Sequence, residues 1–182
     1  MNILVIIGII IAVIGIIAII LINQYNNFQW INVLINKGET NLENAFLKKH
    51  NILVRYLDIL KENKVDIPDE DYDNYKEINP KQSIIKINRN IEEITNYINK
   101  IMDNNEKLLK NETIININKE INEINITING GKKYYNDNLV IYNNLCNAFP
   151  SKIIAKIKKY REKDFLDNDT KDELKILEEK TC

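Results

Sequence analysis

The residues of this sequence best suited to nucleophilic catalysis or metal binding are one histidine and two cysteines. His50 is the only histidine, and Cys146 and Cys182 are the only cysteines. A cysteine beside a histidine can form a nucleophile pair, and distance along the chain does not exclude one. The neighbours Lys48 and Lys49, however, are typical of an exposed basic turn. Two cysteines are too few for a disulfide framework, so we expect reduced thiols.

A short acidic stretch has the beginning of a calcium-binding pattern. Asp69, Asp71 and Asp73 alternate as they do in the first half of an EF-hand loop. The pattern then fails, because Asn74 stands where the loop needs glycine and Pro80 where it needs a bidentate glutamate. The sequence therefore predicts a solvated acidic connection between helices, with no metal site.

No other motif in the sequence indicates catalysis. There is no glycine-rich phosphate loop, no CxxC pair and no paired-histidine metal motif. The formal net charge of −1 gives no sequence-wide attraction to nucleic acid. We therefore expect a protein that is not an enzyme, uses no cofactor or metal and does not bind nucleic acid. One alternative stays open, a membrane-tethered enzyme or sensor that uses His50 and the acidic connection.

The elements that must position these residues begin with an apolar segment. Residues 3–22 read ILVIIGIIIAVIGIIAIILI, and at about 1.5 Å per residue they span roughly the 30 Å hydrocarbon core of a membrane. The basic start, shorter apolar core and small-residue cleavage site of a secretory signal are missing. We expect residues 1–22 to be a retained transmembrane anchor. Gly8 and Gly15 are seven residues apart, whereas closely packed transmembrane helices favour small residues four apart. A homo-oligomer therefore stays an open alternative without support from this spacing.

Apolar residues at intervals of three and four predict long amphipathic helices after the anchor. The first helix continues the anchor through Leu60, because no proline interrupts the chain before Pro68. Tyr25, Phe28 and Trp30 are placed for an interfacial aromatic belt, although Trp30 could equally pack in the bundle.

Two further stripes follow the acidic connection. One runs through residues 84–101, and the other through residues 114–149 with an expected bend, rather than a break, at Gly130-Gly131. Pro150 stops the third helix, and Ser151 is the expected N-cap of a shorter fourth.

Stripes of this length must be buried, and moderate connections place consecutive helices antiparallel. The predicted fold is all-α, in which the transmembrane helix continues into an elongated antiparallel bundle of three long helices and a shorter C-terminal one. The bundle is expected over residues 23–166, and residues 167–182 form a polar tail that could be helical.

A Tyr-Asn pair occurs twice in the third stripe, seven residues apart. Residues at this spacing share a helix face after two turns, which predicts an aromatic ridge flanked by amides. The rings would locate neighbouring helices and the amides would fix their register; a ligand-binding ladder of Tyr and Asn is the alternative. The ridge consists of Tyr135, Asn136, Tyr142, Asn143, Phe149 and Pro150.

A basic cluster, SKIIAKIKKYREK, follows at residues 151–163. A basic amphipathic helix can lie on an anionic membrane or bind an acidic partner. In an up-and-down bundle this helix would begin at the membrane-distal end, so we expect solvation or an unidentified protein partner rather than contact with the protein's own membrane. The cluster places the apolar residues Ile153, Ile157 and Tyr160 on one face and the candidate interaction surface mostly on another, namely Lys152, Lys156, Lys159 and Lys163.

Taken in order, three features resemble the bacterial LemA family. They are the N-terminal membrane helix, the segment LKKHNIL at residues 47–53, and the closing segment YYNDNLVIYNNLCNAFPSKIIAKIKKYREKDF. The resemblance implies a short N-terminus outside the bacterial inner (cell) membrane and a helical domain in the cytoplasm. It implies no activity, because the biochemical role of the family is poorly defined; it suggests membrane organisation or an association with envelope stress.

The sequence thus predicts a single-pass membrane protein, bound to the bilayer through residues 3–22, whose bundle is a scaffold or protein-interaction module. Charge alone does not fix its orientation, since only Lys37 lies in the window where positive charge steers insertion. A domain that faces outward and binds envelope material is the remaining alternative.

Overall fold

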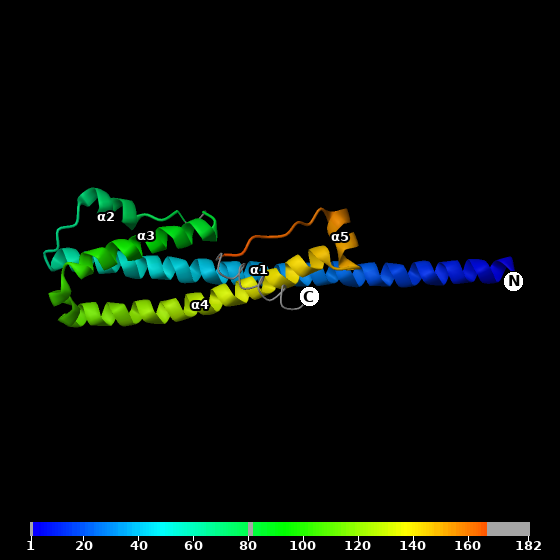
Figure 1. Ribbon diagram of the computed structural model, residues 1–182, viewed down its shortest axis with the longest axis horizontal. Coiled ribbons are helices and arrows are strands. Elements are labelled where there is room, and N and C mark those ends of the chain that lie inside the picture. The colour runs from blue at the N-terminus through cyan, green and yellow to red at the C-terminus, as the bar shows by residue number, and fades with distance from the viewer. Residues whose placement is uncertain (1, 80–81, 167–182) are drawn as a thin grey trace, which may run out of the picture. The chain divides into compact units, whose positions relative to one another are not determined.

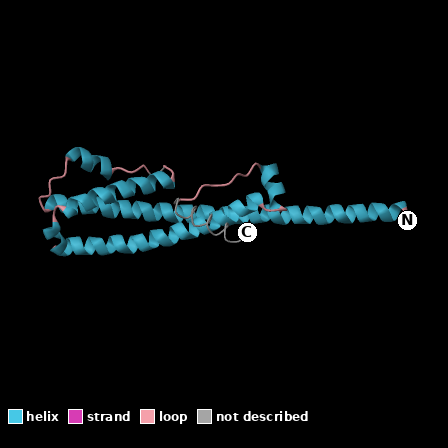
Figure 2. Ribbon diagram, in the orientation of Figure 1, coloured by secondary structure: helices cyan, strands magenta, loops and turns pink. Residues whose placement is uncertain are grey.

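The computed structural model describes residues 2–79 and 82–166, and every regular element in these ranges is a helix (Figure 1, Figure 2). The predicted all-α class is therefore confirmed. The elements in chain order are α1 (Ile3–Glu62), α2 (Asp69–Lys76), α3 (Ile84–Asp103), the 3-10 helix η1 (Glu106–Lys110), α4 (Glu112–Asn147) and α5 (Ser151–Lys158).

The chain divides into two compact units. The first unit contains residues 1–37 and 134–182, and the second contains residues 38–133. Helices α1 and α4 contribute to both units. The predicted tail at residues 167–182 and Cys182 lie outside the described residues.

Helix α1 confirms that the apolar segment and the first amphipathic stripe form one continuous helix. Among the described residues it is the one helix long and apolar enough to cross a membrane. Side chains in its apolar part are exposed, and the buried hydrophobic side chains of the described residues begin only at Phe28. The first part of α1 therefore contributes little to the core of its own unit.

In the second unit, the predicted stripe of α3 is confirmed from Ile84 to Ile98, but its last buried residue is Met102 rather than Ile101. Its buried side chains are Ile84, Ile87, Ile91, Ile94, Ile98 and Met102. They recur at threes and fours because 3.6 residues make one turn, so all six share one face. Most of the remaining residues are polar or charged, and one of them, Tyr97, packs its ring 5.0 Å from that of Tyr75 in α2.

The direction of α3 differs from the expected up-and-down order. Its beginning lies near His50 and its end near Asn63, because one cavity is lined by His50 and Asn90 and another by Asn63 and Asp103. Helix α3 is therefore parallel to this part of α1 (Figure 1). The connection at residues 63–83 contains α2 and is long enough to return along α3 before that helix begins.

Helix α4 does run antiparallel to α1 in the second unit. Arg55 of α1 pairs with Glu120 of α4 at 2.8 Å, and Asn111 at the start of α4 bonds to Asn63 at 3.2 Å. The glycine pair does not break α4, which continues from Glu112 to Asn147. A β-carbon on Gly131 would lie 2.9 Å from Cδ2 of Leu42, so the second glycine allows α1 and α4 to approach closely.

Candidate functional site

The first unit is built around three aromatic rings. The ring centroid of Phe28 lies 5.7 Å from that of Tyr142 and 5.0 Å from that of Tyr160. The Phe28–Tyr142 pair has an interplanar angle of 82°, the edge-to-face arrangement that aromatic pairs favour. Phe28 is fully buried, so the expectation that it belongs to an interfacial belt is wrong. Trp30, in contrast, is 61% exposed and does not pack in the bundle.

The two asparagines of the Tyr-Asn repeat bind the backbone of the segment that follows α5. Asn143 donates from Nδ2 to the carbonyl oxygen of Lys163 at 3.0 Å and accepts at Oδ1 from the Lys163 N–H at 2.9 Å. Asn136 accepts at Oδ1 from the N–H of Leu166 at 3.2 Å. Residues 159–166 form no helix or strand, so these side chains satisfy backbone groups that have no ladder of their own.

The spacing of seven residues between the two asparagines matches the geometry of this contact. Seven helical residues rise about 10.5 Å, and the three residues from Lys163 to Leu166 cover about 10 Å when extended. Two amides on one helix face can therefore meet two points on one extended segment. The tyrosines of the two pairs, Tyr135 and Tyr142, are buried beside them.

The third aromatic of the predicted ridge does not join the other two. Phe149 follows the end of α4 and is 83% exposed, which contradicts its expected packing role. The helix ends at Asn147, so the two-turn spacing no longer controls where Phe149 lies. Pro150 precedes α5 and is half-buried.

Helix α5 is shorter than predicted, and its buried face is different. It ends at Lys158, where Lys159 has a left-handed backbone with φ of 57°. The expected N-cap, Ser151, is the first helical residue instead, and its hydroxyl donates to the carbonyl of Ala148 at 2.9 Å. The buried residues are Ser151, Ile154 and Ala155, whereas Ile153 and Ile157, expected on the apolar face, are 40% and 64% exposed.

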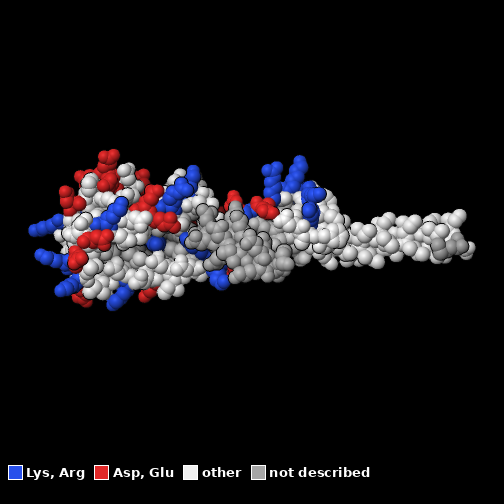
Figure 3. Space-filling model, viewed as in Figure 1, with Lys and Arg blue, Asp and Glu red and all other residues white. Residues whose placement is uncertain are grey.

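The structure also corrects the expected position of the basic cluster. Nζ of Lys158 lies 5.2 Å from the centroid of the Tyr25 ring, and Gln29 donates to the hydroxyl of Tyr160 at 3.1 Å. The cluster therefore lies beside the part of α1 that directly follows the apolar segment, not at its far end. Figure 3 shows basic side chains gathered next to the uncharged N-terminal stretch.

The four lysines of the candidate surface are not equivalent. Lys152, Lys156 and Lys159 are exposed. Lys163 is half-buried, with Nζ 5.0 Å from the centroid of the Tyr142 ring and 3.4 Å from Oδ1 of Asn32. Lys163 is thus part of the packed unit, and the accessible positive charge comes from the other three.

Burial makes Cys146 a poor nucleophile. Desolvation raises the pKa of its thiol, and Glu162 adds to the rise, so the reactive thiolate is less populated than in a free cysteine. Burial also raises the pKa of Tyr142 to about 12, which keeps the phenol neutral.

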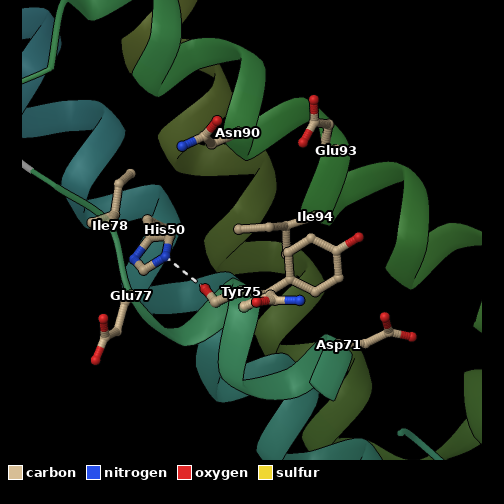
Figure 4. Close-up of a pocket in the computed structure, with 9 residues that line it drawn as sticks. His50, Asp71, Tyr75, Glu77, Ile78, Asn90, Glu93 and Ile94 are labelled. Carbon is tan, nitrogen blue, oxygen red and sulfur yellow. Dashed lines mark hydrogen bonds between the residues drawn. The ribbon is translucent and has the colours of Figure 1, made fainter. Parts of the chain in front are cut away.

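His50 lies in the second unit, where the structure overturns the expected exposed turn. It is in the middle of α1 and only 3% exposed. Its Nε2 lies 2.9 Å from the carbonyl oxygen of Tyr75, which can only accept, so Nε2 is the donor (Figure 4). Nδ1 of the same ring is buried without a hydrogen-bond partner.

His50 lines a cavity of about 300 Å³ between α1, α3 and the acidic connection. Acidic side chains from both sides line it, namely Asp71, Glu77 and Glu93. None of the described residues that line it is a cysteine. Helix α2 explains the position of Asp71, because the stretch predicted as an irregular connection folds into a helix beside His50.

No group of three or more His, Cys, Asp or Glu side chains in the described part of the chain is arranged to hold a metal ion. The sequence indicated both halves of this cavity, the histidine and the acidic stretch, and one open alternative combined them, but no pattern in the sequence places them beside one another. Asn90 and Glu93 of α3 were not singled out, because they are ordinary polar residues on the outer face of an amphipathic stripe.

Comparison with known proteins assigns the chain to a family through a match over residues 61–176. No match was found among curated proteins or among solved structures. The family model described as "LemA family" matches residues 61–176, which is more than half of the chain and includes both Tyr-Asn pairs and α5. This region contains the segment that carries the resemblance in the sequence, and the chain belongs to the LemA family.

Proposed function

We propose that this protein is a membrane-anchored helical scaffold whose first unit lies on the surface of the bilayer that holds residues 3–22. The proposal assigns it no catalytic step. Its partners are the bilayer and a protein that binds the exposed helical surfaces.

The contacts of Lys158 in α5 and of Tyr160 just after it with residues 25–29 of α1 carry this proposal. These residues lie only a few positions after the apolar segment, about 5–10 Å beyond it at the helical rise. The headgroup layer on each side of a bilayer extends about 5–8 Å beyond the hydrocarbon core. A membrane that contains residues 3–22 would therefore have its headgroups at the level of α5.

The composition of the exposed face of α5 fits that position. Phe149, Ile153 and Ile157 expose apolar surface, and lysines surround them. Apolar side chains beside lysines are typical of helices that lie in a membrane interface and contact anionic lipids. Membership of the LemA family supports the bacterial cell membrane as the site of the anchor and the cytoplasm as the location of the helical units.

A fluorescent probe on α5 tests the lipid contact. In protein that lacks other thiols (Cys146→Ala, Cys182→Ser), an environment-sensitive dye is attached at Ile157→Cys and, as a control, at Lys107→Cys, which is exposed in η1. In nanodiscs with anionic lipid we expect blue-shifted emission only from position 157. Equal spectra at the two positions would remove the lipid contact from the proposal.

The orientation is tested with the same Lys107→Cys protein in cells. A membrane-impermeant maleimide is added to intact and to lysed cells. We expect labelling only after lysis. Labelling in intact cells would place the helical units outside and favour the alternative of an envelope-binding domain.

A further inference from the structure

Helix α1 exposes large apolar side chains shortly after the apolar segment. Trp30 is 61% exposed and Val33 is 63% exposed, although Phe28 and Ile31 on the other side of the same helix are fully buried. All four residues belong to the first unit. Removing apolar surface of this size from water is favourable, and tryptophan is enriched at the centre of protein interfaces. This face of α1 therefore suits an apolar protein partner.

Lipid does not reach these two side chains. At about 1.5 Å per residue, Trp30 lies about 12 Å and Val33 about 16 Å beyond Ile22, the last residue of the apolar segment. The headgroup layer extends only about 5–8 Å beyond the hydrocarbon core. Both side chains therefore lie beyond the headgroups of a membrane that holds residues 3–22, so their cover must come from protein.

Inside the apolar segment, the residues on the same face of α1 are small. Eighteen residues of an α-helix make about five full turns, so residues at this interval lie on one line along the helix. Three small residues precede three exposed ones by this interval, and the pairs are Gly8 with Asn26, Ala12 with Trp30, and Gly15 with Val33. A β-carbon added to either glycine would meet no atom within 4 Å, so the space beside them is open.

The small residues include the spacing that the two glycines alone lack. Gly8 and Ala12 are four residues apart, and such a pair allows two transmembrane helices to approach closely. Gly15 extends the small surface by about one turn. The face follows the 3.6-residue period of a straight helix from Gly8 to Val33, so two copies of α1 can lie side by side along it with little supercoiling.

We propose that α1 binds α1 of a second copy of this chain through this face, as a parallel dimer. We call the face the α1 seam, and it consists of Gly8, Ala12, Gly15, Asn26, Trp30 and Val33. The dimer rests on the membrane anchor of the proposed function, and it gives the scaffold a defined protein partner.

Three features favour a second copy over another protein. Copies anchored in one bilayer share its orientation and depth, so each presents the seam at the same height, as a twofold dimer requires. No charged side chain occurs in residues 2–36, so two seams bring no like charges together before Lys37. Asn26 would meet its own copy in the dimer, and an amide pair of this kind fixes the register of two helices.

Two adjacent asparagines give a matched test of the seam. In protein that lacks other thiols (Cys146→Ala, Cys182→Ser), a single cysteine is introduced as Asn26→Cys on the seam or as Asn27→Cys, at an exposed position about 100° away around α1. Membranes from cells that contain each variant are oxidised with copper phenanthroline. We expect a disulfide-linked dimer several-fold more abundant from Asn26→Cys. Equal amounts from the two variants, no dimer from either, or a linked product with another protein would overturn the proposal.

A charge on the seam provides a second test. In the Asn26→Cys protein, Val33→Asp places two like charges against each other in the dimer, whereas Asn27→Asp adds the same charge away from the seam. Like charges brought together out of water repel each other, so we expect the first variant to lose most of the linked dimer and the second to keep it. A dimer equally abundant in the two variants would show that the exposed apolar residues are not paired and would overturn the proposal.

The part of the seam inside the membrane is tested with Gly8→Leu. The larger side chain separates two closely packed helices, whereas Ala18→Leu makes a similar enlargement about 80° away around α1. In the Asn26→Cys protein we expect only Gly8→Leu to reduce the linked dimer. Equal reduction, or none, would remove the small residues from the interface and overturn the proposal.

Measuring the membrane fraction separates this proposal from the anchor on which it rests. Protein missing from the membrane fraction would overturn the anchor and the dimer together. Membrane-bound protein without the selective disulfide would overturn the dimer alone, because the lipid contact of α5 is measured independently at Ile157→Cys.

Discussion

Asn143 holds an irregular segment against a helix by using both ends of its amide. It donates to the carbonyl and accepts from the N–H of the same residue, Lys163. A side chain that forms this pair replaces the bonds that a neighbouring strand would otherwise supply. Asn136 repeats the N–H contact two turns earlier.

Replacing Asn143 with alanine is expected to destabilise the first unit by roughly 1–3 kcal/mol, because two half-buried backbone groups of Lys163 lose their partners. The matched control is Asn144→Ala, at the adjacent exposed position, which should change stability by less than about 0.5 kcal/mol. Urea unfolding followed by circular dichroism measures both. Similar losses in the two variants would show that the amide bonds contribute nothing specific.

Tyr97 is expected to make stability depend on high pH. Burial, and then its hydrogen bond to Asp71 at 3.1 Å, raise its pKa from 10.0 to about 12. Because the folded state favours the neutral phenol, this contribution is complete below pH 10 and is lost as the pH rises through about 12.

The corresponding measurement compares wild-type protein with Tyr97→Phe, which keeps the ring and cannot ionise. Between these two pH values the wild-type protein should lose urea resistance relative to the variant. A difference that stays constant across that range would contradict the raised pKa.

Single residues also show which side-chain positions the helical periodicity predicts and which it does not. Tyr142 was expected to be a packed aromatic, and its spacing from Tyr135 places both on one buried face. Phe149 continues the same spacing but follows the last helical residue, so periodicity no longer applies to it. The partners of the asparagines lie in a segment without periodicity, and no pattern could have indicated them.

At the scale of elements, the two glycines of α4 have opposite surroundings. A β-carbon on Gly130 would meet no atom within 4 Å, whereas one on Gly131 would meet the buried side chain of Leu42. Glycine in a helix interior is less stable than alanine. Replacing it with alanine gives the full stabilisation only where the added methyl group meets no neighbouring atom.

Gly130→Ala is therefore expected to stabilise the protein by about 0.5–1 kcal/mol. Gly131→Ala should be less stable than Gly130→Ala by roughly 1–3 kcal/mol, because Leu42 must move from a packed position. Thermal unfolding of the two single variants ranks them. The reverse ranking would show that α1 and α4 are not in close contact at Leu42.

The helices themselves were predictable because isoleucine recurs with the helical period, as in α3. The short helix α2 was not, because its acidic residues include no buried side chain and hence no stripe. The direction of α3 depends on the path of residues 63–83, which periodicity does not determine. His50 and Glu93 line one cavity because α3 runs in this direction.

At the scale of the whole molecule, the apolar segment and the folded core are separate parts of the sequence. The hydrophobic side chains that are buried in the described ranges begin at Phe28, after the segment at residues 3–22. A change confined to that segment should therefore affect membrane attachment without affecting the core.

Deleting residues 2–22 is expected to move the protein from the membrane fraction to the soluble fraction while leaving its thermal unfolding nearly unchanged. Fractionation of cell lysates and calorimetry of the purified protein measure the two effects. A truncated protein that still sediments with membranes after a high-salt wash would show that residues 3–22 are not the anchor. One that is soluble but unfolded would show that the apolar segment supports the core.

The contacts of Asn136 and Asn143 also constrain how the lengths of two distant stretches can change during evolution. Inserting one residue between the asparagines would turn one amide by about 100° away from the segment it binds. Inserting two full turns would restore the face, but the distance would then match only if the facing segment gained about three residues. Insertions and deletions in these two stretches are therefore expected to occur together, in a ratio of about seven to three.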